Sequence, residues 1–238
     1  HLRNENYDEL IEDAAEIPGI LKKQILGLAY QQNFFNEKLT NTFFGKQYGI
    51  GIQQSRYVSA TGEYHKANDS KNYYGYGLAS RLKLLDELGV KFSFEKAYRL
   101  QEVGEMFGNG YTVVANLDLK PESSQNLNVG AYYGLRIHKH KIFLEGSWFY
   151  RRANDFIYSV VYQSNSSVSR FENTSKVKVT GLEGDLKYNY ADLLYVNANL
   201  SYQNAINMTK YSPGSAGSTT EATYLNKIPN QPWLFGNL

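Results

Sequence analysis

Apolar and polar residues alternate along most of this chain, with the period of two that is typical of β-strands with one apolar and one polar face. A clear case begins at Asn126, where Leu127, Val129 and Ala131 alternate with amides and glycine. The segments that show this pattern, and are predicted to be strands, are 25–35, 38–52, 73–85, 90–98, 125–136, 141–152, 177–190, 194–205 and 223–238.

The two faces of these strands differ in the same way from one strand to the next. We expect the apolar residues to point to the outside of a curved sheet and the polar residues to point to its inside. The outward set is Leu127, Val129, Ala131, Leu135, Leu186, Val196 and Leu200, and the inward set is Asn126, Asn128, Arg136, Glu183, Asp185, Asn197 and Asn199. A soluble β-sandwich shows similar alternation, so the period alone does not distinguish a sandwich from a barrel wall.

The connections between the predicted strands alternate in length. The short turns are 36–37, 86–89, 138–140 and 191–192, and the long connections are 53–72, 99–123, 153–175 and 206–222. Transmembrane barrels have short turns at one end and long loops at the other. The strands are about 10–14 residues long, and a tilted strand needs ~9–11 to cross a bilayer. The predicted fold class is therefore all-β, an antiparallel up-and-down meander of about nine to ten strands that is part of a large transmembrane β-barrel.

Composition adds three constraints to this prediction. The 238 residues include 21 Tyr and 20 Gly but no Cys, which suits a β-sheet and excludes disulfides and cysteine metal sites. No run of about 18 apolar residues occurs, which excludes a transmembrane helix but not a barrel, because barrel strands are only half apolar. The net charge of +2 gives no reason to expect a nucleic-acid partner.

The stretch 99–130 carries the most specific spacing in the chain. Its fixed positions are Arg99, Glu105-Met106-Phe107-Gly108, Asn116, Leu119-Lys120-Pro121-Glu122-Ser123, Asn126 and Gly130. This spacing resembles the barrel signature of TonB-dependent outer-membrane receptors, from which it departs at Gln101, Leu117 and Asn128. Segments 44–48, 181–184 and 227–232 are also similar to barrel segments of that family, so the resemblance covers most of the chain.

The resemblance implies a receptor in the outer membrane of a Gram-negative bacterium that takes up a large scarce ligand, such as a ferric siderophore, haem, cobalamin or a glycan. The implied partners are outer-membrane lipid, the small-molecule or glycan ligand, and a periplasmic energy-coupling protein that binds a region before residue 1. Barrels of the family have about 22 strands and a plug. We therefore expect residues 1–238 to be a partial barrel domain without the plug and the final strands. An enzyme is not expected, nor is a cofactor.

The long connections hold the candidate ligand-binding residues, because Tyr-rich loops over a pore can grip a ligand by stacking and hydrogen bonding. These candidates are Tyr57, Tyr64, Arg99, Glu105, Phe107 and Tyr111. The alternative for each is a surface residue without a ligand. Arg99 has the same strand parity as Lys91 and Glu95, so we expect it to point inward and to pair with Glu102 or Glu105.

No catalytic constellation is evident. His138 and His140 lie in a short turn without a third ligand nearby, which favours a solvated turn over a metal site. Glu145, Glu183 and Asp185 are conceivable as paired carboxylates for glycoside hydrolysis, but they suit the charged lining of a barrel better. Two alternatives to the receptor stay open: a soluble secreted β-rich module that binds a glycan or another ligand, and a β-sheet hydrolase that uses these carboxylates.

Overall fold

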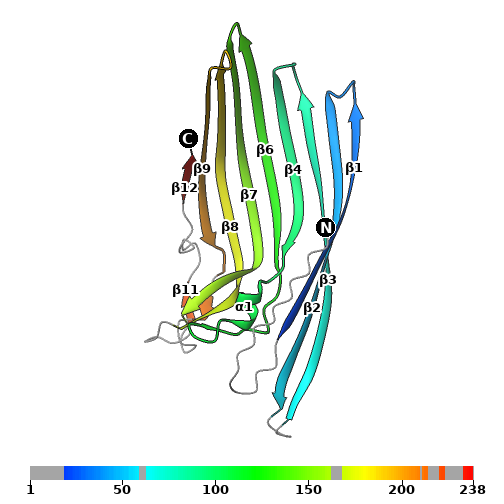
Figure 1. Cartoon of the computed structure of the whole chain (residues 1–238), viewed down its shortest axis with the longest axis vertical. Helices are drawn as coiled ribbons and strands as arrows, with labels where there is room; N and C mark the ends of the chain where they lie inside the picture. Colours follow the sequence, from blue (N-terminus) through cyan, green and yellow to red (C-terminus); the bar gives the residue numbers. More distant parts are fainter. Residues whose placement is uncertain are drawn as a thin grey trace.

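The structure is a computed structural model that describes residues 19–58, 63–161, 168–209, 211–213, 220–222 and 233–237. Antiparallel strands follow one another along one sheet in the order β1-β2-β3-β4-β6-β7-β8-β9-β12 (Figure 1). Their bounds are β1 Ile20–Phe34, β2 Leu39–Val58, β3 Glu63–Lys83, β4 Leu88–Arg99, β6 Glu122–Ile137, β7 His140–Val161, β8 Ser169–Tyr190, β9 Leu194–Asn207 and β12 Leu234–Asn237.

The remaining elements are short and lie between the long strands. They are α1 Val103–Phe107, β5 Val113–Val114, β10 Tyr211–Pro213 and β11 Thr220–Ala222. β10 and β11 pair with each other, and β5 pairs with β8 in parallel. The sheet is thus not purely antiparallel, which is a small correction to the predicted meander. Among the described residues no helix is long and apolar enough to span a membrane.

The sheet is open, as predicted. Within the described ranges, β1 pairs only with β2, and β12 pairs only with β9, so the first and last strands do not meet. Each edge therefore leaves one row of backbone N–H and C=O groups without a strand partner among these residues.

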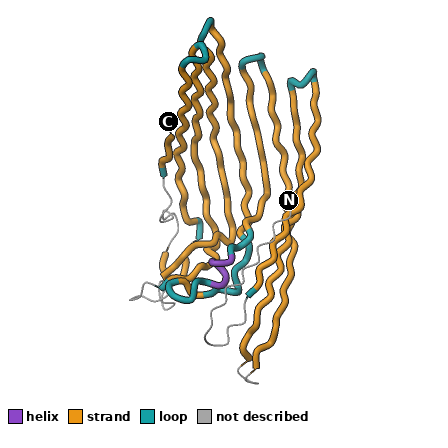
Figure 2. Tube along the Cα trace, in the orientation of Figure 1, coloured by secondary structure: helices purple, strands orange, loops and turns teal. Residues whose placement is uncertain are grey.

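The short turns all lie at one end of the sheet, here called the turn rim, and the long connections lie at the other end, the loop rim (Figures 1 and 2). Several turn residues have positive φ, among them Asn36, His138 and Asp192. Such φ values match the twist of tight hairpins and are tolerated best by Asn, Asp and Gly. The predicted placement of successive connections at opposite ends of the sheet is therefore confirmed for the described part of the chain (Figure 1). The predicted difference in length is not confirmed between β2 and β3, because only 59–62 separate these two strands.

Two of the predicted long loops are mostly strand. β2 and β3 continue through 53–72 until only 59–62 separate them, and β7 and β8 continue through most of 153–175. The added parts of β2 and β3 are mostly polar, so the alternation of apolar residues stops there before the strands do, whereas the added part of β7 still contains apolar residues such as Phe156 and Ile157. Backbone hydrogen bonds between neighbouring strands can continue outside an apolar layer, so loss of the apolar pattern marks the edge of that layer and not the end of pairing.

The register separates the side chains into an apolar face and a polar face, as predicted. Directly opposed residues share a face, and Leu186 stands opposite Leu144 and Ala198, whereas Asp185 stands opposite Glu145 and Asn199. The apolar face is open to the surroundings, with Leu200 56% exposed. No second sheet of comparable size packs on it among the described residues. This arrangement does not favour the soluble sandwich.

Candidate functional site at the loop rim

The segment 100–121, here called the strap, leaves the sheet at the end of β4 and returns to it at the start of β6. It lies at the loop rim and includes α1 and β5 (Figure 2, where the helix is purple). A long connection was predicted here, and the structure gives it a fixed path. Its contacts show how it is held.

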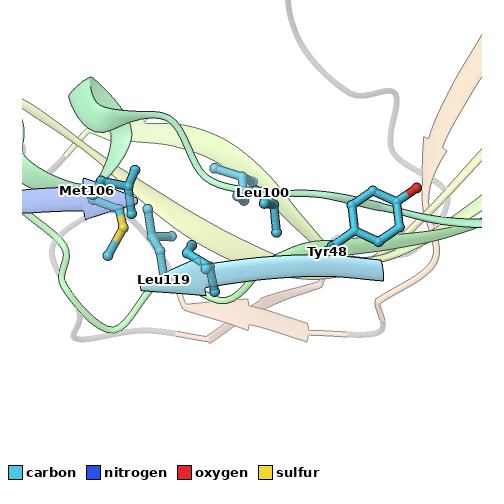
Figure 3. Packing of buried hydrophobic residues seen from close by; sticks show 7 residues of the cluster. Tyr48, Leu100, Met106 and Leu119 are labelled. Carbon is cyan, nitrogen blue, oxygen red and sulfur yellow. The ribbon is translucent and has the colours of Figure 1, made fainter. Parts of the chain in front are cut away.

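An apolar cluster attaches the strap to the polar face of the sheet. Met106 and Leu119 of the strap are buried with Leu21 of β1 and Tyr48 of β2 (Figure 3). Ile157 of β7 belongs to the same cluster, although β7 lies far from β1 in the strand order. The strap therefore crosses the polar face between two distant parts of the sheet.

Four charged side chains hold the two ends of the strap. Arg99 at the end of β4 donates from Nη1 to Glu105 Oε1 at 2.9 Å and Oε2 at 3.1 Å, and from Nε to Glu122 Oε2 at 3.3 Å. Arg151 of β7 donates to the other oxygen of Glu122. We call Arg99, Glu105, Glu122 and Arg151 the charge quartet. The quartet contains two cations and two anions, so its net charge is zero. Each carboxylate is therefore removed from water together with an opposite charge, which offsets part of the cost of its burial.

The members of the quartet differ in how far their side chains are buried. The side chain of Glu122 is 2% exposed, whereas Arg99 and Arg151 are partly open to solvent. Burial disfavours the charged guanidinium of Arg99, but its hydrogen bonds to Glu105 and Glu122 outweigh that effect and raise its pKa above the ordinary value. Arg99 thus stays charged, and Glu122, the carboxylate between the two arginines, is the most deeply buried member of the quartet.

The first turn of the strap uses the same Glu105. Its Oε2 accepts the backbone N–H of Glu102 at 2.9 Å, which satisfies one of the free donors at the start of α1. Glu102 itself binds Lys23 of β1, with 2.7 Å between Nζ and Oε2. Of the two predicted partners for Arg99, Glu105 is confirmed and Glu102 instead joins the strap to β1.

The second half of the strap is joined to β8. Val113 and Val114 pair with Ser169 and Arg170. Asn116 donates from Nδ2 to the carbonyl of Phe171 at 2.7 Å. Further along, Asn173 of β8 accepts the backbone N–H of Lys120 and donates to its carbonyl, both at 2.9 Å. These bonds satisfy backbone groups of a segment that has almost no regular structure of its own.

The tip of the strap is a tight turn that presents an aromatic ring. Asn109 Oδ1 accepts the backbone N–H groups of residues 111, 112 and 113 at 2.8–3.0 Å. Gly108 and Gly110 on either side of Asn109 have φ of 70° and 73°, a region that strains residues with a Cβ. Tyr111 on this turn is 84% exposed. The backbone is fixed while the ring is free to meet a ligand.

The candidate residues fall into three groups. Arg99 and Glu105 are brought together in the quartet. Phe107 packs against the apolar cluster, and Tyr111 is exposed at the tip. Tyr57 and Tyr64 were expected in a loop, but they lie in β2 and β3, opposite each other near the end of that hairpin. The side chains of these two residues lie outside the described part of the structure.

Sequence reasoning did not assign roles to Glu122, Arg151 or Lys23. A signal existed for the first two: Glu122 is part of the spacing that includes Arg99, and Arg151 has the parity of the polar face. Strand pairing was the missing information, since Arg99 stands directly opposite Glu122. Lys23 carried no signal, because it contacts the strap from a strand 79 positions earlier in the sequence.

The rest of the polar face carries paired charges. Lys46 binds Glu95 at 2.8 Å and Lys91 binds Glu145 at 2.7 Å. The neighbouring carboxylate Glu183 lines a shallow hollow of about 340 Å³ together with Arg81 and several hydroxyl and amide side chains. Alternating ion pairs on a hydroxyl-rich surface suit a hydrated interior, and they are dispersed over several strands instead of converging as a catalytic pair does.

Comparisons with known proteins agree with this architecture. Residues 40–237 match the sequence model of the family described as TonB dependent receptor-like, beta-barrel. No curated protein matches the chain.

Solved structures of the same architecture are similar to this one over 92% of the chain. The siderophore receptor PiuA from Acinetobacter baumannii has a TM-score of 0.66 at 15% identity, with 30% of its chain covered. The hemophore receptor HasR of Serratia marcescens, solved as a double mutant with its hemophore HasA and heme, has 0.61 at 16%, with 39% covered. The ferric yersiniabactin uptake receptor FyuA from Yersinia pestis has 0.56 at 16%, with 31% covered.

Identities this low show a shared fold alone, and the chain spans 30–39% of the length of these three relatives. The family match is of a different kind, since it extends over most of the sequence. It includes the strap and every member of the charge quartet. The chain belongs to the family of TonB-dependent receptor-like β-barrels.

Proposed function

We propose that this chain forms part of the wall of an outer-membrane receptor that takes up a scarce ligand by energy-coupled transport, and that the strap forms part of the ligand entrance. The observation that carries the proposal is the position of the strap: it crosses the polar face at the loop rim, held by the charge quartet, with Tyr111 exposed. An aromatic ring on a fixed turn at the mouth of a hydrated passage suits ligand capture.

The exposed apolar face supports a lipid environment. Its large side chains on neighbouring strands, such as Leu182 and Leu200, have no covering layer among the described residues. An apolar surface that continues across a whole sheet is far larger than a soluble monomer leaves open. Outer-membrane lipid is therefore the proposed partner of this face, and localisation in the outer membrane of a Gram-negative bacterium follows from it.

The open edges support a longer barrel. We propose that residues 1–238 form a partial barrel domain and that further strands cover the outer edges of β1 and β12, because unpaired backbone groups are costly in lipid. A plug domain and a region that binds a periplasmic energy-coupling protein belong to the same proposal. Transport of this kind needs no enzymatic step by the chain.

The ligand class is proposed from the relatives. PiuA is named as a siderophore receptor and FyuA as a ferric yersiniabactin uptake receptor, HasR is solved with heme, and OprC, another similar structure, is named as a copper transporter. A ferric siderophore, haem or another scarce ligand such as cobalamin or a glycan is the proposed cargo. Tyr111 is the described candidate that is free to contact it, and Tyr57 and Tyr64 stay candidates farther out.

The test is Arg99→Ala in the full-length receptor. Loss of this side chain removes the bonds to Glu105 and Glu122 and should loosen the strap, so ligand binding to whole cells should weaken while the barrel still assembles. Arg152→Ala is the matched control, since Arg152 follows Arg151 on β7 and its side chain lies on the opposite face of the sheet from the quartet. Candidate cargoes are compared by uptake of radiolabelled ferric siderophore, haem and cobalamin. Unchanged ligand affinity in Arg99→Ala, at normal surface expression, removes the proposed role of the strap.

A further inference from the structure

β3 separates from β4 partway along its length. The pairing of the two strands ends at Tyr76 and Lys96, whereas β3 continues to Glu63 with β2 as its partner. A Cβ at Gly75 would lie 2.5 Å from the carbonyl oxygen of Lys96, so a residue without a side chain is needed where the backbones approach before they part. Beyond this point β3 has β2 as its only strand partner among the described residues, and we call its other side the free edge.

Hydrogen bonds identify the backbone groups that face this edge. Lys83 donates its N–H to the carbonyl of Lys38 on the β2 side, and Leu84 donates to Leu88 on the β4 side. The register of β2 and β3 has no interruption, so even-numbered residues of β3 direct their N–H and C=O groups away from β2. Asn68, Ser70 and Asn72 are therefore the edge residues, and all three are exposed. Among the described residues, these three make no backbone hydrogen bond to any strand other than β2.

A pocket of about 310 Å³ lies beside the free edge on the polar face. Its walls are Asp69, Lys71 and Tyr73 of β3, Ile50 and Ile52 of β2, and residues 117–121 of the strap together with Gln101. The three β3 residues are the odd-numbered ones, whose side chains point to the polar face. A side chain that pointed the same way from a strand added to this edge would therefore meet the pocket.

The pocket has an apolar floor and a charged rim. Ile50 and Leu119 are buried, while Asp69 and Lys71 form an exposed ion pair at 2.7 Å. The hydrogen bond to Asp69 raises the pKa of Lys71, so its amine stays charged. Its volume is near the lower end of the ~300–1,000 Å³ range of ligand pockets and admits one large side chain.

We propose that the free edge of β3 around Asn68, Ser70 and Asn72 binds an extended peptide as an added strand, with one apolar side chain of the peptide in the adjoining pocket. Peptide recognition by strand addition has two requirements: unpaired main-chain groups for affinity and a pocket for alternate side chains for specificity. Both occur here on the same strand and in matching parity. The inference goes beyond ligand uptake and does not depend on it.

The edge is placed where a peptide can reach it. β3 has 21 residues, which at ~3.4 Å per residue is about 70 Å, whereas the apolar band of a membrane barrel is ~25 Å tall. The unpaired part lies at the loop rim, outside that band. Edge strands are often protected by proline or bulges, and the described part of this edge has neither.

The experiment measures binding of a fluorescent peptide to the purified full-length receptor in detergent. The probe is about eight residues long, alternates threonine and valine, and has one phenylalanine at its centre. Ser70→Pro removes the edge donor without touching the bonds to β2, and Ser70→Thr is the matched control that keeps it. A second probe with alanine in place of phenylalanine tests the pocket.

We expect Ser70→Pro to weaken binding of the phenylalanine probe by about tenfold, Ser70→Thr to leave it unchanged, and the alanine probe to bind about tenfold more weakly than the phenylalanine probe. Equal binding to Ser70→Pro and wild type, with the barrel shown to be folded by its heat-dependent mobility on gels, overturns the edge site. Equal binding of both probes overturns the pocket. If the receptor forms dimers that Ser70→Pro abolishes, the edge binds a second copy of the receptor and not a peptide, which overturns the proposal. Uptake of cargo measured on the same variants reports separately on transport.

Discussion

Arg99 and Glu122 stand directly opposite each other on β4 and β6, and Arg99 Nε lies 3.3 Å from Glu122 Oε2. These are the last residue before the strap and the first residue after it. The ion pair therefore joins the two ends of the 22-residue strap, where it leaves the sheet and where it returns. Arg151 approaches Glu122 from the other side, so the carboxylate is shared by three adjacent strands.

Glu122→Gln should free the strap while the sheet persists. A neutral amide leaves two arginines facing each other without the buried counter-charge, and loss of one partner of a buried ion pair costs about 3–5 kcal/mol. Because both arginines are partly exposed, we expect about 2–3 kcal/mol of local destabilisation here. Hydrogen exchange of the strap amides measures it.

Glu102→Gln is the comparison for this variant. Glu102 also binds a cation but is 59% exposed, so the expected loss is at most about 1 kcal/mol. If both variants exchange at the same rate, burial of Glu122 has no special importance for the strap.

Met106→Ala and Tyr111→Ala should separate stability of the strap from capture of a ligand. Met106 is fully buried, so its truncation leaves a cavity and costs about 2–5 kcal/mol. Tyr111 is exposed, so its truncation should change stability by less than about 0.5 kcal/mol. Limited proteolysis of the strap and ligand affinity are measured on both variants. Loss of ligand affinity in Tyr111→Ala without faster proteolysis of the strap is the expected result. Faster proteolysis of the strap in this variant would show that the Tyr111 ring contributes to the stability of the strap.

Leu200→Lys and Asn199→Lys test the assignment of the two faces with adjacent residues. Leu200 lies on the apolar face, where a lysine near the middle of the bilayer costs about 2–4 kcal/mol. Asn199 lies on the polar face opposite Asp185, which can receive the new cation. Urea unfolding of the receptor in lipid vesicles should show a large loss for the first variant and a small one for the second. The reverse order would exchange the faces.

Single cysteines test the direction of the two rims. The chain has no Cys, so Tyr111→Cys and Lys139→Cys each provide one labelling site. In intact cells a membrane-impermeant maleimide should label the strap tip but not the turn at 139, because loops of such barrels face outward and turns face the periplasm. A loop carrying an epitope tag within 206–222 should be accessible in the same way. Labelling of Lys139→Cys without labelling of Tyr111→Cys would show that the turn rim faces outward, which is the opposite of the expected orientation.

The sequence allowed the strands, their faces and the two rims to be predicted because each depends on local alternation and on short turns. Pairs such as Leu186 with Ala198 needed only the period of two and consecutive hairpins. The length of the β2–β3 hairpin was missed, because Asn68 and Ser70 carry no apolar alternation outside the membrane layer although their strand continues.

The strap was only partly predictable. Arg99 and Glu105 are close in sequence, and their pairing followed from parity. The contact of Lys23 with Glu102 and the parallel pairing of β5 with β8 depend on how the chain crosses the polar face, and no local pattern encodes that. A two-residue parallel strand has too few positions to show a period.

The attachments of the strap also limit the shape of the sheet. Lys23–Glu102 joins it to β1 and the β5 pairing joins it to β8, and β2, β3, β4, β6 and β7 lie between them in the strand order. Each pair of neighbouring strands can change its twist by a few degrees, so the curvature of an unbraced wall can drift. The strap joins β1 to β8 and so fixes the distance between these two strands at the loop rim. A fixed distance between two strands limits how far the sheet between them can change its curvature. The strap thus resists flattening of the mouth of the barrel into an ellipse, and the opening at the loop rim keeps its width when the wall is pulled or bent.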